Sequence, residues 1–508
     1  MSLRQSMAGL HTWGGLLPSW LLFVIIFAGT VASFDRELER WMRPALHELQ
    51  TSSMTTDDVR DWLKSNVKDE LHAFWMHQPT EREPYWRAGW EVDKTEEFHD
   101  VAFDPATNQP MPDTVGGFFF FTLHYNLHGG MIGMYIVGLA GMFMLVALVS
   151  GVIIHRRIFK DFFTLRPNAN GQRAWLDAHN LFGVVGFPFH LVLAYTGVAI
   201  FVSSYMPAGA QVAYQSNITQ FFGEVMGAYD REGIHKPSAQ QVSLDELVER
   251  SRQHWGGGEP GWVSVHHPGD EAAVVDIRKD DGSRISPPLE TLSYDEATGA
   301  LLNEQKAATG YHAYTWLTGL HMAQFGGTLV RLLYLLMGFA GCAMLVGGLQ
   351  VWLNKREARG DAGIGLVRAL NGAVFAGLPL ASLALLWGNR LIPAGVAERA
   401  VAEGWVFVGS WLLVALWSAL RWQQPRSLLR QQLALGAVLA LGLPLLNALT
   451  TPHGSLLSSL PRGDWALAAI DLFLLFAGLV SALCAWRLAQ PQAVKVARDR
   501  RALVEETA

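Results

Sequence analysis

The sequence has little charge and almost no cysteine. Only 17% of its 508 residues are charged, whereas 50% are hydrophobic. A soluble protein of this length would carry more charge, so the composition favours a membrane protein with several spanning helices. The two cysteines, Cys342 and Cys484, both lie inside apolar runs. This excludes a disulfide framework, a thiolate zinc site and a cysteine-ligated iron–sulfur cluster.

Motifs for nucleotides and nucleic acids are also missing. No glycine-rich dinucleotide motif and no P-loop follows a predicted strand, so the chain encodes no nicotinamide, flavin or nucleotide domain. The net charge of -6 and the lack of a basic patch interleaved with aromatic residues give no sign of nucleic-acid binding.

Long apolar runs are abundant instead. The run at 130–154 has no ionisable side chain, and about 20 residues at roughly 1.5 Å each cross a hydrocarbon core of about 30 Å. We predict an all-α polytopic membrane bundle of about eight transmembrane helices, with two small α+β domains outside the lipid. The predicted segments are a first span at 8–34, a polar domain at 35–117, a second span at 118–158, a third span at 175–206, a second polar domain at 207–315, a fourth span at 316–355, four further spans within 365–488 and a tail at 489–508.

The distribution of Lys and Arg predicts the orientation. Basic residues cluster in the loops at 156–173, 355–368 and 421–430 and in the tail, whereas the loops at 389–402 and 450–464 carry few. Positive charge marks the cytoplasmic side of a membrane protein. Both termini are therefore expected in the cytoplasm and both polar domains in the periplasm. Since no small-residue cleavage site follows the first apolar run, that run is expected to be a retained helix.

The sequence contains an internal duplication. His11 begins the first span and His179 the third, and Gly29 and Gly197 follow these histidines at the same distance. Such self-similarity indicates a repeated structural unit. The unit is a span, a polar domain and a second span, used twice in parallel orientation. Two such halves should pack around a pseudo-twofold axis along the membrane normal.

Two further features occur once in each half. His124 and His321 precede the second and fourth spans, and a pair of glycines follows each of them. A strand that runs into an Asp-x-x-Thr turn occurs at 103–108 and again at 294–299. The duplication therefore covers the polar domains as well as the spans.

Twofold symmetry pairs the repeated histidines. His11 would face His179 near the inner surface, and His124 would face His321 near the outer surface. Two imidazoles related by a twofold axis are what a planar macrocycle with an axial iron needs. A single interfacial histidine can equally be a polar residue at headgroup level, but ionisable side chains within membrane helices are costly and usually functional. The two pairs would lie about 30 Å apart, so electron flow between them needs a relay.

Four other residues are candidates for the same site. His190, eleven residues after His179 on the same helix face, would be a mid-depth ligand or relay, or else a core histidine bonded to a backbone carbonyl. His155 would ligate an inner haem or join a basic collar. His128 would be a substitute ligand or line the outer haem edge. Arg331 would pair with a haem propionate or extend its charge to the membrane surface.

Taken together, these motifs resemble the PepSY-associated transmembrane family. The resemblance rests on the histidine-led starts of spans one and three, on HYNLHGG…SGVIIHRRIFKDFFTLRP at 124–167 and on DAHN…PFH…YTG at 177–197. It covers about residues 8–358 and leaves the last four spans outside. Asn108 departs from the family pattern, which usually has Gly at that point of the hairpin.

The resemblance implies a fold, a cofactor and an activity. It implies periplasmic PepSY domains and two or more b-type haems held by His11, His124, His179 and His321. His155 and His190 match the pattern of a subgroup. The family includes bacterial inner-membrane proteins that deliver electrons to ferric siderophore iron.

We therefore predict a haem-dependent ferric siderophore reductase of the bacterial inner membrane. Electrons would pass from a quinol or a cytoplasmic reductase to a periplasmic acceptor, and reduction would release iron because hard oxygen donors favour Fe(III) over Fe(II). No side chain would do covalent chemistry, since the protein sets axial ligands, burial and haem orientation. Two alternatives remain open: PepSY modules that restrain a periplasmic peptidase without redox activity, and a transporter with a histidine-lined path.

Overall fold

The computed structural model describes residues 2–491 except 49, 94, 96, 156–165, 167–170, 216, 227, 228, 230, 281–283, 287, 288 and 307. Most of the predicted basic loop at 156–173 and nearly all of the predicted tail at 489–508 lie outside the described residues. The chain divides into two compact units. The first unit comprises residues 1–359 and 394–401, and the second comprises residues 360–393 and 402–508.

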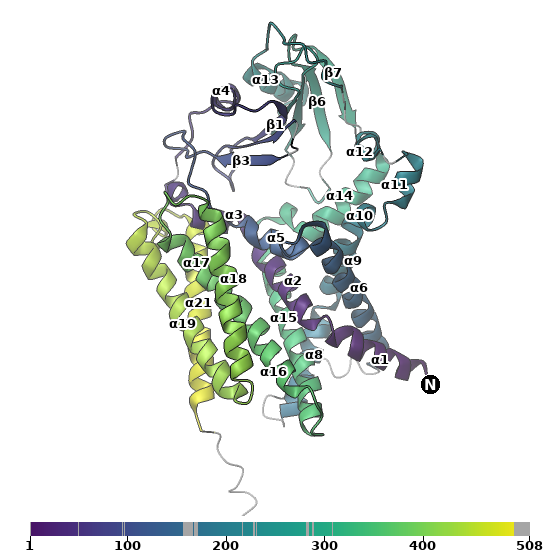
Figure 1. Ribbon diagram of the computed structural model, residues 1–508, viewed down its shortest axis with the longest axis vertical. Helices are drawn as coiled ribbons and strands as arrows, with labels where there is room; N and C mark the ends of the chain where they lie inside the picture. Colours follow the sequence, from purple (N-terminus) through teal and green to yellow (C-terminus); the bar gives the residue numbers. More distant parts are fainter. Residues whose placement is uncertain are drawn as a thin grey trace, which may run out of the picture. The chain divides into compact units, whose positions relative to one another are not determined.

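The protein is a mostly helical membrane protein (Figure 1). Six stretches of helix among the described residues are long and apolar enough to cross a membrane, and two bent helix pairs raise the possible number of spans to eight. The six stretches are α6 (Gly130–Ile154), α15 (Gly327–Glu357), α16 to α17 (Ile364–Leu391), α18 (Arg399–Leu420), α19 (Pro425–Thr450) and α21 (Trp465–Ala489).

The first and third predicted spans are bent rather than straight. Helices α1 (Leu3–Leu16) and α2 (Ser19–Ala32) meet at 61°, and α8 (Gly171–Val185) and α9 (Phe187–Ile200) meet at 65°. Pro18 caps α2 and Pro188 lies in the first turn of α9. Proline lacks an N–H and its ring clashes with the preceding turn, so a helix breaks or kinks in front of it.

The second and fourth spans are each preceded by a separate helix. Helix α5 (Phe118–Asn126) precedes α6, and α14 (Thr309–Met322) precedes α15. Leu127 and Ala323 end these helices in the left-handed conformation, each with φ of 56°. The span predicted at 118–158 is therefore two helices with a chain reversal between them.

All seven strands form one antiparallel sheet, in the order β3-β2-β1-β4-β5-β6-β7. The prediction of two separate α+β domains is corrected here, because β1 pairs with β4 from Ala73↔His266 to His77↔Trp262. Pairing the two segments removes two strand edges that separate small sheets would leave exposed. The strands are β1 (Leu71–His77), β2 (Arg87–Val92), β3 (Phe98–Ala102), β4 (Pro260–His266), β5 (Val274–Lys279), β6 (Glu290–Asp295) and β7 (Leu301–Lys306).

Helices α4 (Thr56–Asn66) and α13 (Leu244–His254) cover one face of the sheet (Figure 1). Side chains alternate along a strand, so every second residue enters the core between these helices and the sheet. Val263, Val265 and Ile277 are completely buried there. The intervening residues of β1, β4 and β5 lie on the opposite face.

The two predicted Asp-x-x-Thr turns have equivalent geometry. The N–H of Asn108 donates to the carbonyl of Asp104, and the N–H of Gly299 donates to that of Asp295, each over 2.8 Å. Both Asn108 (φ 58°) and Gly299 (φ 69°) are left-handed. Asparagine tolerates this conformation better than other non-glycine residues, which explains its departure from the family pattern.

Shorter helical segments connect these elements. They are α3 (Asp35–Met42), η1 (Pro44–His47), α10 (Val202–Tyr205), α11 (Ala208–Ala213), α12 (Ile218–Met226), η2 (Gln324–Gly326), the π-helical η3 (Gly372–Ala376) between α16 (Ile364–Asn371) and α17 (Gly377–Leu391), and α20 (Leu456–Ser459).

Candidate functional site

His11 on α1 and His179 on α8 lie next to each other in the helical bundle. Their ring centroids are 6.1 Å apart. His11 Nδ1 is 2.8 Å from the carbonyl oxygen of Ala147 on α6. His179 Nδ1 is also 2.8 Å from a carbonyl oxygen, that of Met344 on α15. The two rings are thus held in the same way by different helices.

A second pair consists of His124 on α5 and His321 on α14, with ring centroids 5.8 Å apart. His124 Nδ1 is 2.8 Å from the carbonyl oxygen of Ile25 on α2. His321 Nδ1 is 3.0 Å from the hydroxyl of Thr196 on α9. That hydroxyl donates its proton to a backbone carbonyl one turn earlier, so its oxygen accepts from the His321 ring.

These contacts define which ring nitrogen carries the proton. A carbonyl oxygen only accepts hydrogen bonds, so Nδ1 of His11, His124 and His179 must be protonated, and Nδ1 of His321 donates to the hydroxyl of Thr196. A neutral imidazole protonated at Nδ1 has a lone pair at Nε2, the usual nitrogen for metal ligation. Within the part of the chain that the structure describes, no hydrogen bond reaches Nε2 of any of the four rings.

Each of the four rings also packs against a glycine of a neighbouring helix. A Cβ atom at any of these glycines would come within 3.1 Å of the imidazole, which is closer than van der Waals contact allows. The repeated glycines of the sequence therefore leave room for the rings. The pairs are Gly151 with His11, Gly348 with His179, Gly29 with His124 and Gly197 with His321.

The histidine pairs fit a metal that brings most of its own ligands. Among the described residues, no group of three or more His, Cys, Asp or Glu side chains could hold a metal ion. Two imidazoles are too few for a structural zinc site, which needs four ligands. They suffice for a haem iron, whose macrocycle fills four positions. With metal–nitrogen bonds of about 2.0–2.1 Å, two axial imidazoles have ring centroids roughly 6 Å apart.

His190 and His128 differ from these four histidines in the nitrogen that they use. His190 is 2% exposed, and its Nε2 is 2.9 Å from the carbonyl oxygen of Met337, whereas its buried Nδ1 has no partner among the described residues. His128 Nε2 is 3.0 Å from the carbonyl oxygen of Phe119. In both rings the nitrogen that usually ligates haem iron is already bonded to the backbone.

His155 follows α6 and does not belong to either pair. Its backbone N–H donates to the carbonyl of Gly151, and its buried Nδ1 has no hydrogen-bond partner among the described residues. The predicted basic collar around it, Arg156 and Arg157, lies outside the described residues.

Arg331 is already paired with a protein carboxylate. Its guanidinium forms an ion pair with Glu37 on α3 and lies 5.5 Å from the ring centroid of Phe34. Burial alone would raise the pKa of Glu37, but the hydrogen bond and charge of Arg82 and the charge of Arg331 together lower it. Arg331 therefore joins α15 to α3, a contact that the sequence does not reveal.

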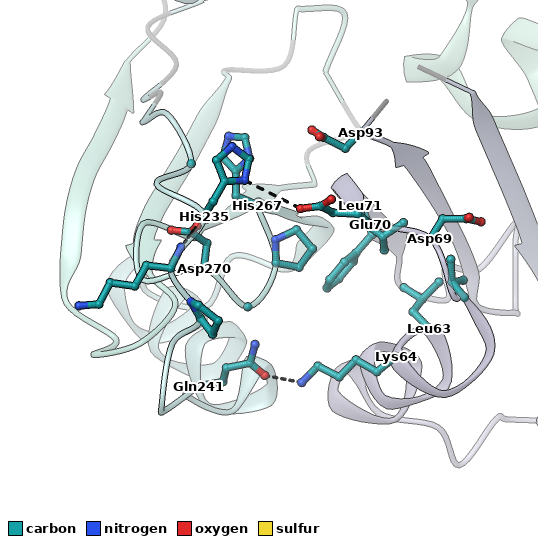
Figure 2. Close-up of a pocket in the computed structure, with 17 residues that line it drawn as sticks. Leu63, Lys64, Asp69, Glu70, Leu71, Asp93, His235, Gln241, His267 and Asp270 are labelled. Atoms are coloured by element: carbon teal, nitrogen blue, oxygen red, sulfur yellow. Dashed lines mark hydrogen bonds and ion pairs between the residues drawn. The ribbon is translucent and has the colours of Figure 1, made fainter. Parts of the chain in front are cut away.

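A cavity of about 380 Å³ lies in the sheet region (Figure 2). His235 and His267 line it, and both have left-handed backbones with φ of 54° and 52°. His235 Nδ1 is 3.9 Å from Glu70, and Lys64 hydrogen-bonds Gln241 across the cavity. The cavity holds none of the site residues predicted from the sequence. Its lining comes from both polar segments, whose pairing was not foreseen.

Comparisons with known proteins match most of the first unit, including the strands of the sheet. A family model described as the PepSY-associated TM region matches residues 8–355. The chain is also 30% identical over 317 residues to an uncharacterized protein of Pseudomonas aeruginosa, an alignment that covers 58% of this chain and 76% of that protein. The matched region contains both histidine pairs.

Proposed function

Because the chain belongs to the PepSY-associated TM region family, we propose that it carries electrons across a bacterial inner membrane through b-type haems and reduces ferric siderophore iron on the outer face. The observation that supports this most directly is the two pairs of facing imidazoles. Each ring has a fixed Nδ1–H and an Nε2 that no described residue hydrogen-bonds. This is the arrangement that two axial ligands of one iron require.

In this proposal each pair holds one haem. His11 and His179 hold the inner group, and His124 and His321 hold the outer group. When bound, haem iron supplies the one-electron chemistry. The carbonyl and hydroxyl acceptors orient the rings and keep Nδ1 protonated. The apolar helices around the rings exclude water.

An internal duplication explains why the two halves repeat these contacts. Ala147 and Met344, which accept from the inner histidines, are 197 residues apart in the sequence, and so are His124 and His321. The bends before α2 and α9 are also alike, at 61° and 65°. Two copies of one ancestral unit would supply one ligand each to both haems.

The orientation follows from the basic loops, which place both termini in the cytoplasm. The sheet then lies in the periplasm as a joint PepSY-like module. Helix α14 begins three residues after β7 ends and carries His321 near its end. The outer pair is thus on the side of the sheet. Electrons would enter near the inner pair, from a quinol or a separate cytoplasmic reductase.

The reaction that we propose is one-electron reduction of chelated Fe(III) to Fe(II). Siderophores bind iron through hard oxygen donors, which hold Fe(II) much less tightly than Fe(III). Reduction therefore frees the iron without covalent change to the chelator. No side chain acts as an acid, a base or a nucleophile in this step.

A haem count tests the proposal. We expect a pyridine haemochrome assay on the purified full chain to give two b-type haems. His11→Ala, His179→Ala, His124→Ala and His321→Ala should each lose one of them. His254→Ala, on the exposed side of α13, is the control and should keep both. Elution volume on gel filtration distinguishes haem loss from misfolding. Unchanged haem content in all four variants would refute the proposal.

A further inference from the structure

The sheet face opposite α4 and α13 carries an aromatic surface where β1 and β4 meet. The rings of Trp75 and Trp262 are parallel to within 2°, with centroids 6.1 Å apart. The ring of His77 is 4.4 Å from that of Trp262. The guanidinium of Arg278, on β5, lies 5.5 Å from the Trp262 ring centroid. A flat pair of indoles is thus placed beside a cation.

Polar atoms next to this surface are buried and have no hydrogen-bond partner among the described residues. They are Asp276 Oδ1, Arg278 Nε, Thr291 Oγ1 and Ser293 Oγ. The register of β5 and β6 pairs Asp276 with Ser293 and Arg278 with Thr291, so the four residues form one patch. Buried polar atoms nearly always have hydrogen-bond partners, and leaving one unpaired costs about 1–3 kcal/mol. Arg278 Nε and the two hydroxyls can donate to a ligand that supplies acceptor oxygens, whereas Asp276 Oδ1 is itself an acceptor.

Arginines from three elements lie around the patch, and the carboxylates of Asp35, Glu83 and Asp276 lie among them. Arg36 on α3 and Arg87 on β2 both pair with the single carboxylate of Glu83. Arg36 also lies 3.6 Å from Asp35. Arg278 forms no ion pair with any residue of the described chain, and the Trp262 ring is its close contact. Its guanidinium is therefore available to an anion.

The pKa of His77 reflects the positive charges around it. The pKa of His77 is lowered to about 4, first by burial and then by the charges of Arg87, Arg36 and Arg278. Three cations from three elements thus act on one imidazole. The imidazole is neutral at physiological pH, so it adds an aromatic ring to the patch without adding charge.

The patch is close to the helix that carries the outer histidine pair. The hydroxyls of Ser286, between β5 and β6, and of Thr315, on α14, are 2.6 Å apart, and the charge of Arg278 opposes the burial that raises the pKa of Tyr311, at the start of α14. His321 lies ten residues further along α14. Ten residues of helix span roughly 15 Å. A ligand on the patch would be near the place where the proposed electron path ends.

We propose that this aromatic patch, formed by Trp75, His77, Trp262, Arg278, Thr291 and Ser293, binds the ferric chelate, and that the chelate is an anion with aromatic catecholate groups. The inference rests on the proposed function, because that function is what makes the ligand of this patch an electron acceptor. Guanidinium groups form charge-assisted hydrogen bonds with anionic oxygens. Indole rings stack with planar aromatic groups. A neutral hydroxamate chelate offers neither the charge nor the ring.

Binding of gallium chelates tests the inference separately from electron transfer. Ga(III) has the charge and ligand preference of Fe(III) but accepts no electron under these conditions. The full chain in nanodiscs is equilibrated by dialysis with gallium tris(2,3-dihydroxybenzoate) or with the neutral gallium tris(acetohydroxamate). We expect the wild type to prefer the catecholate complex by at least about tenfold, since charge and stacking both favour it. If the chain lacks haem but still shows this preference, the proposed function fails and the site remains.

Variants of the patch sharpen the test. Arg278→Gln should weaken catecholate binding by about tenfold or more, and Arg278→Lys should restore only part of it because lysine lacks the planar fork. Trp262→Leu should weaken binding, whereas Trp262→Phe should retain most of it. Arg252→Gln, on α13 behind the sheet, is the matched control and should bind as the wild type does. Elution volume checks that each variant is folded.

Three outcomes would overturn the inference. One is equal affinity of the wild type for the two gallium complexes. Another is unchanged catecholate binding in Arg278→Gln. The third is displacement of the bound catecholate complex by short-chain phosphatidylglycerol when the lipid is at a lower concentration than the complex. The patch would then be a lipid headgroup site.

Discussion

The helices of the first unit and those of the second unit use buried polar side chains in different ways. In the first unit the paired histidines each bond one ring nitrogen to the protein and leave the other unbonded. Helices α17, α18, α19 and α21 contain no histidine. They bury a hydrogen-bonded network instead, which consists of Asn389, Arg390, Glu403, Asn447 and Asp471.

In that network each polar side chain hydrogen-bonds another. Arg390 Nε donates to Asn447 Oδ1 over 3.0 Å, and Arg390 Nη1 donates to Asn389 Oδ1 over 2.8 Å. Asn389 Nδ2 donates to Glu403 over 2.9 Å, and Asn447 Nδ2 donates to Asp471 over 3.2 Å. A network with its charges and amides bonded together stabilises the helix ends on its own. The histidine pairs, in contrast, are complete only with a ligand.

The largest effect is expected where the second unit's network is broken. Arg390→Met removes the cation and leaves the buried carboxylates of Glu403 and Asp471 without it. Loss of one partner from a buried ionic network costs about 3–5 kcal/mol. We expect a clear fall in the midpoint of thermal unfolding, while the haem content of the folded fraction stays unchanged. Arg430→Met, at an exposed position of α19, is the control. A normal melting temperature for Arg390→Met would contradict the structural role of the network.

The next largest effect is expected at the glycines that face the rings. Gly197→Ala places a Cβ about 2.8 Å from His321 and must displace its imidazole. Overpacking of this kind costs about 1–3 kcal/mol. We expect loss of the outer haem in the haemochrome assay, with the inner haem retained. Gly9→Ala has open space around its Cβ and should keep both haems. Retention of both haems in Gly197→Ala would show that close packing of this ring is not needed.

An effect of comparable size on stability, but without loss of haem, is expected for the ion pair between α3 and α15. Because the pKa of Glu37 is lowered from its ordinary value of 4.5, ionised Glu37 stabilises the fold. That contribution is fully present above about pH 4.5 and is lost as the pH falls through the lowered pKa. Glu37→Gln should cost about 1.5–3 kcal/mol at pH 7 and should flatten the acid limb of the stability curve. Glu246→Gln, in an exposed pair with Arg250, should leave that limb unchanged.

The smallest effect is expected at His190. The residue at the corresponding position of the first half is Leu22, which is also buried. His190→Leu removes the hydrogen bond to Met337 and one unpaired nitrogen, so we expect a stability change of only about 1 kcal/mol. Both haems should remain. Loss of a haem in His190→Leu would show that His190 is a haem ligand. It would contradict the conclusion that a hydrogen bond at Nε2 separates His190 from the four paired histidines.

The spans could be predicted from the sequence because hydropathy depends on composition alone. The apolar runs occur where the sequence predicts them. The bends were not predicted, although Pro18 and Pro188 mark both of them. The pairing of the histidines followed from the repeat, since equal offsets imply equal positions in two halves.

Long-range contacts could not be predicted in the same way. The pairing of β1 with β4 depends on strand edges that look alike in sequence, so two domains were expected where one sheet exists. The pairing of Arg331 with Glu37 joins residues 294 positions apart, and no local pattern indicates it. The orientation of each imidazole depends on a carbonyl of another helix. Residue type alone therefore does not separate His190 from the haem-facing histidines.

The central strand pair of the sheet imposes an order on the assembly of the chain. Ala73 pairs with His266, so the ribosome must make nearly two hundred further residues, including two spans, before β1 finds its neighbour. Until then β1 is an open edge that any extended peptide can join. Chaperones that bind unpaired strands, or rapid insertion of α6 through α9, would protect the nascent chain during this interval. A chain whose translation stops before β4 is made would keep one edge of β1 exposed. Such a chain would be prone to aggregation and proteolysis.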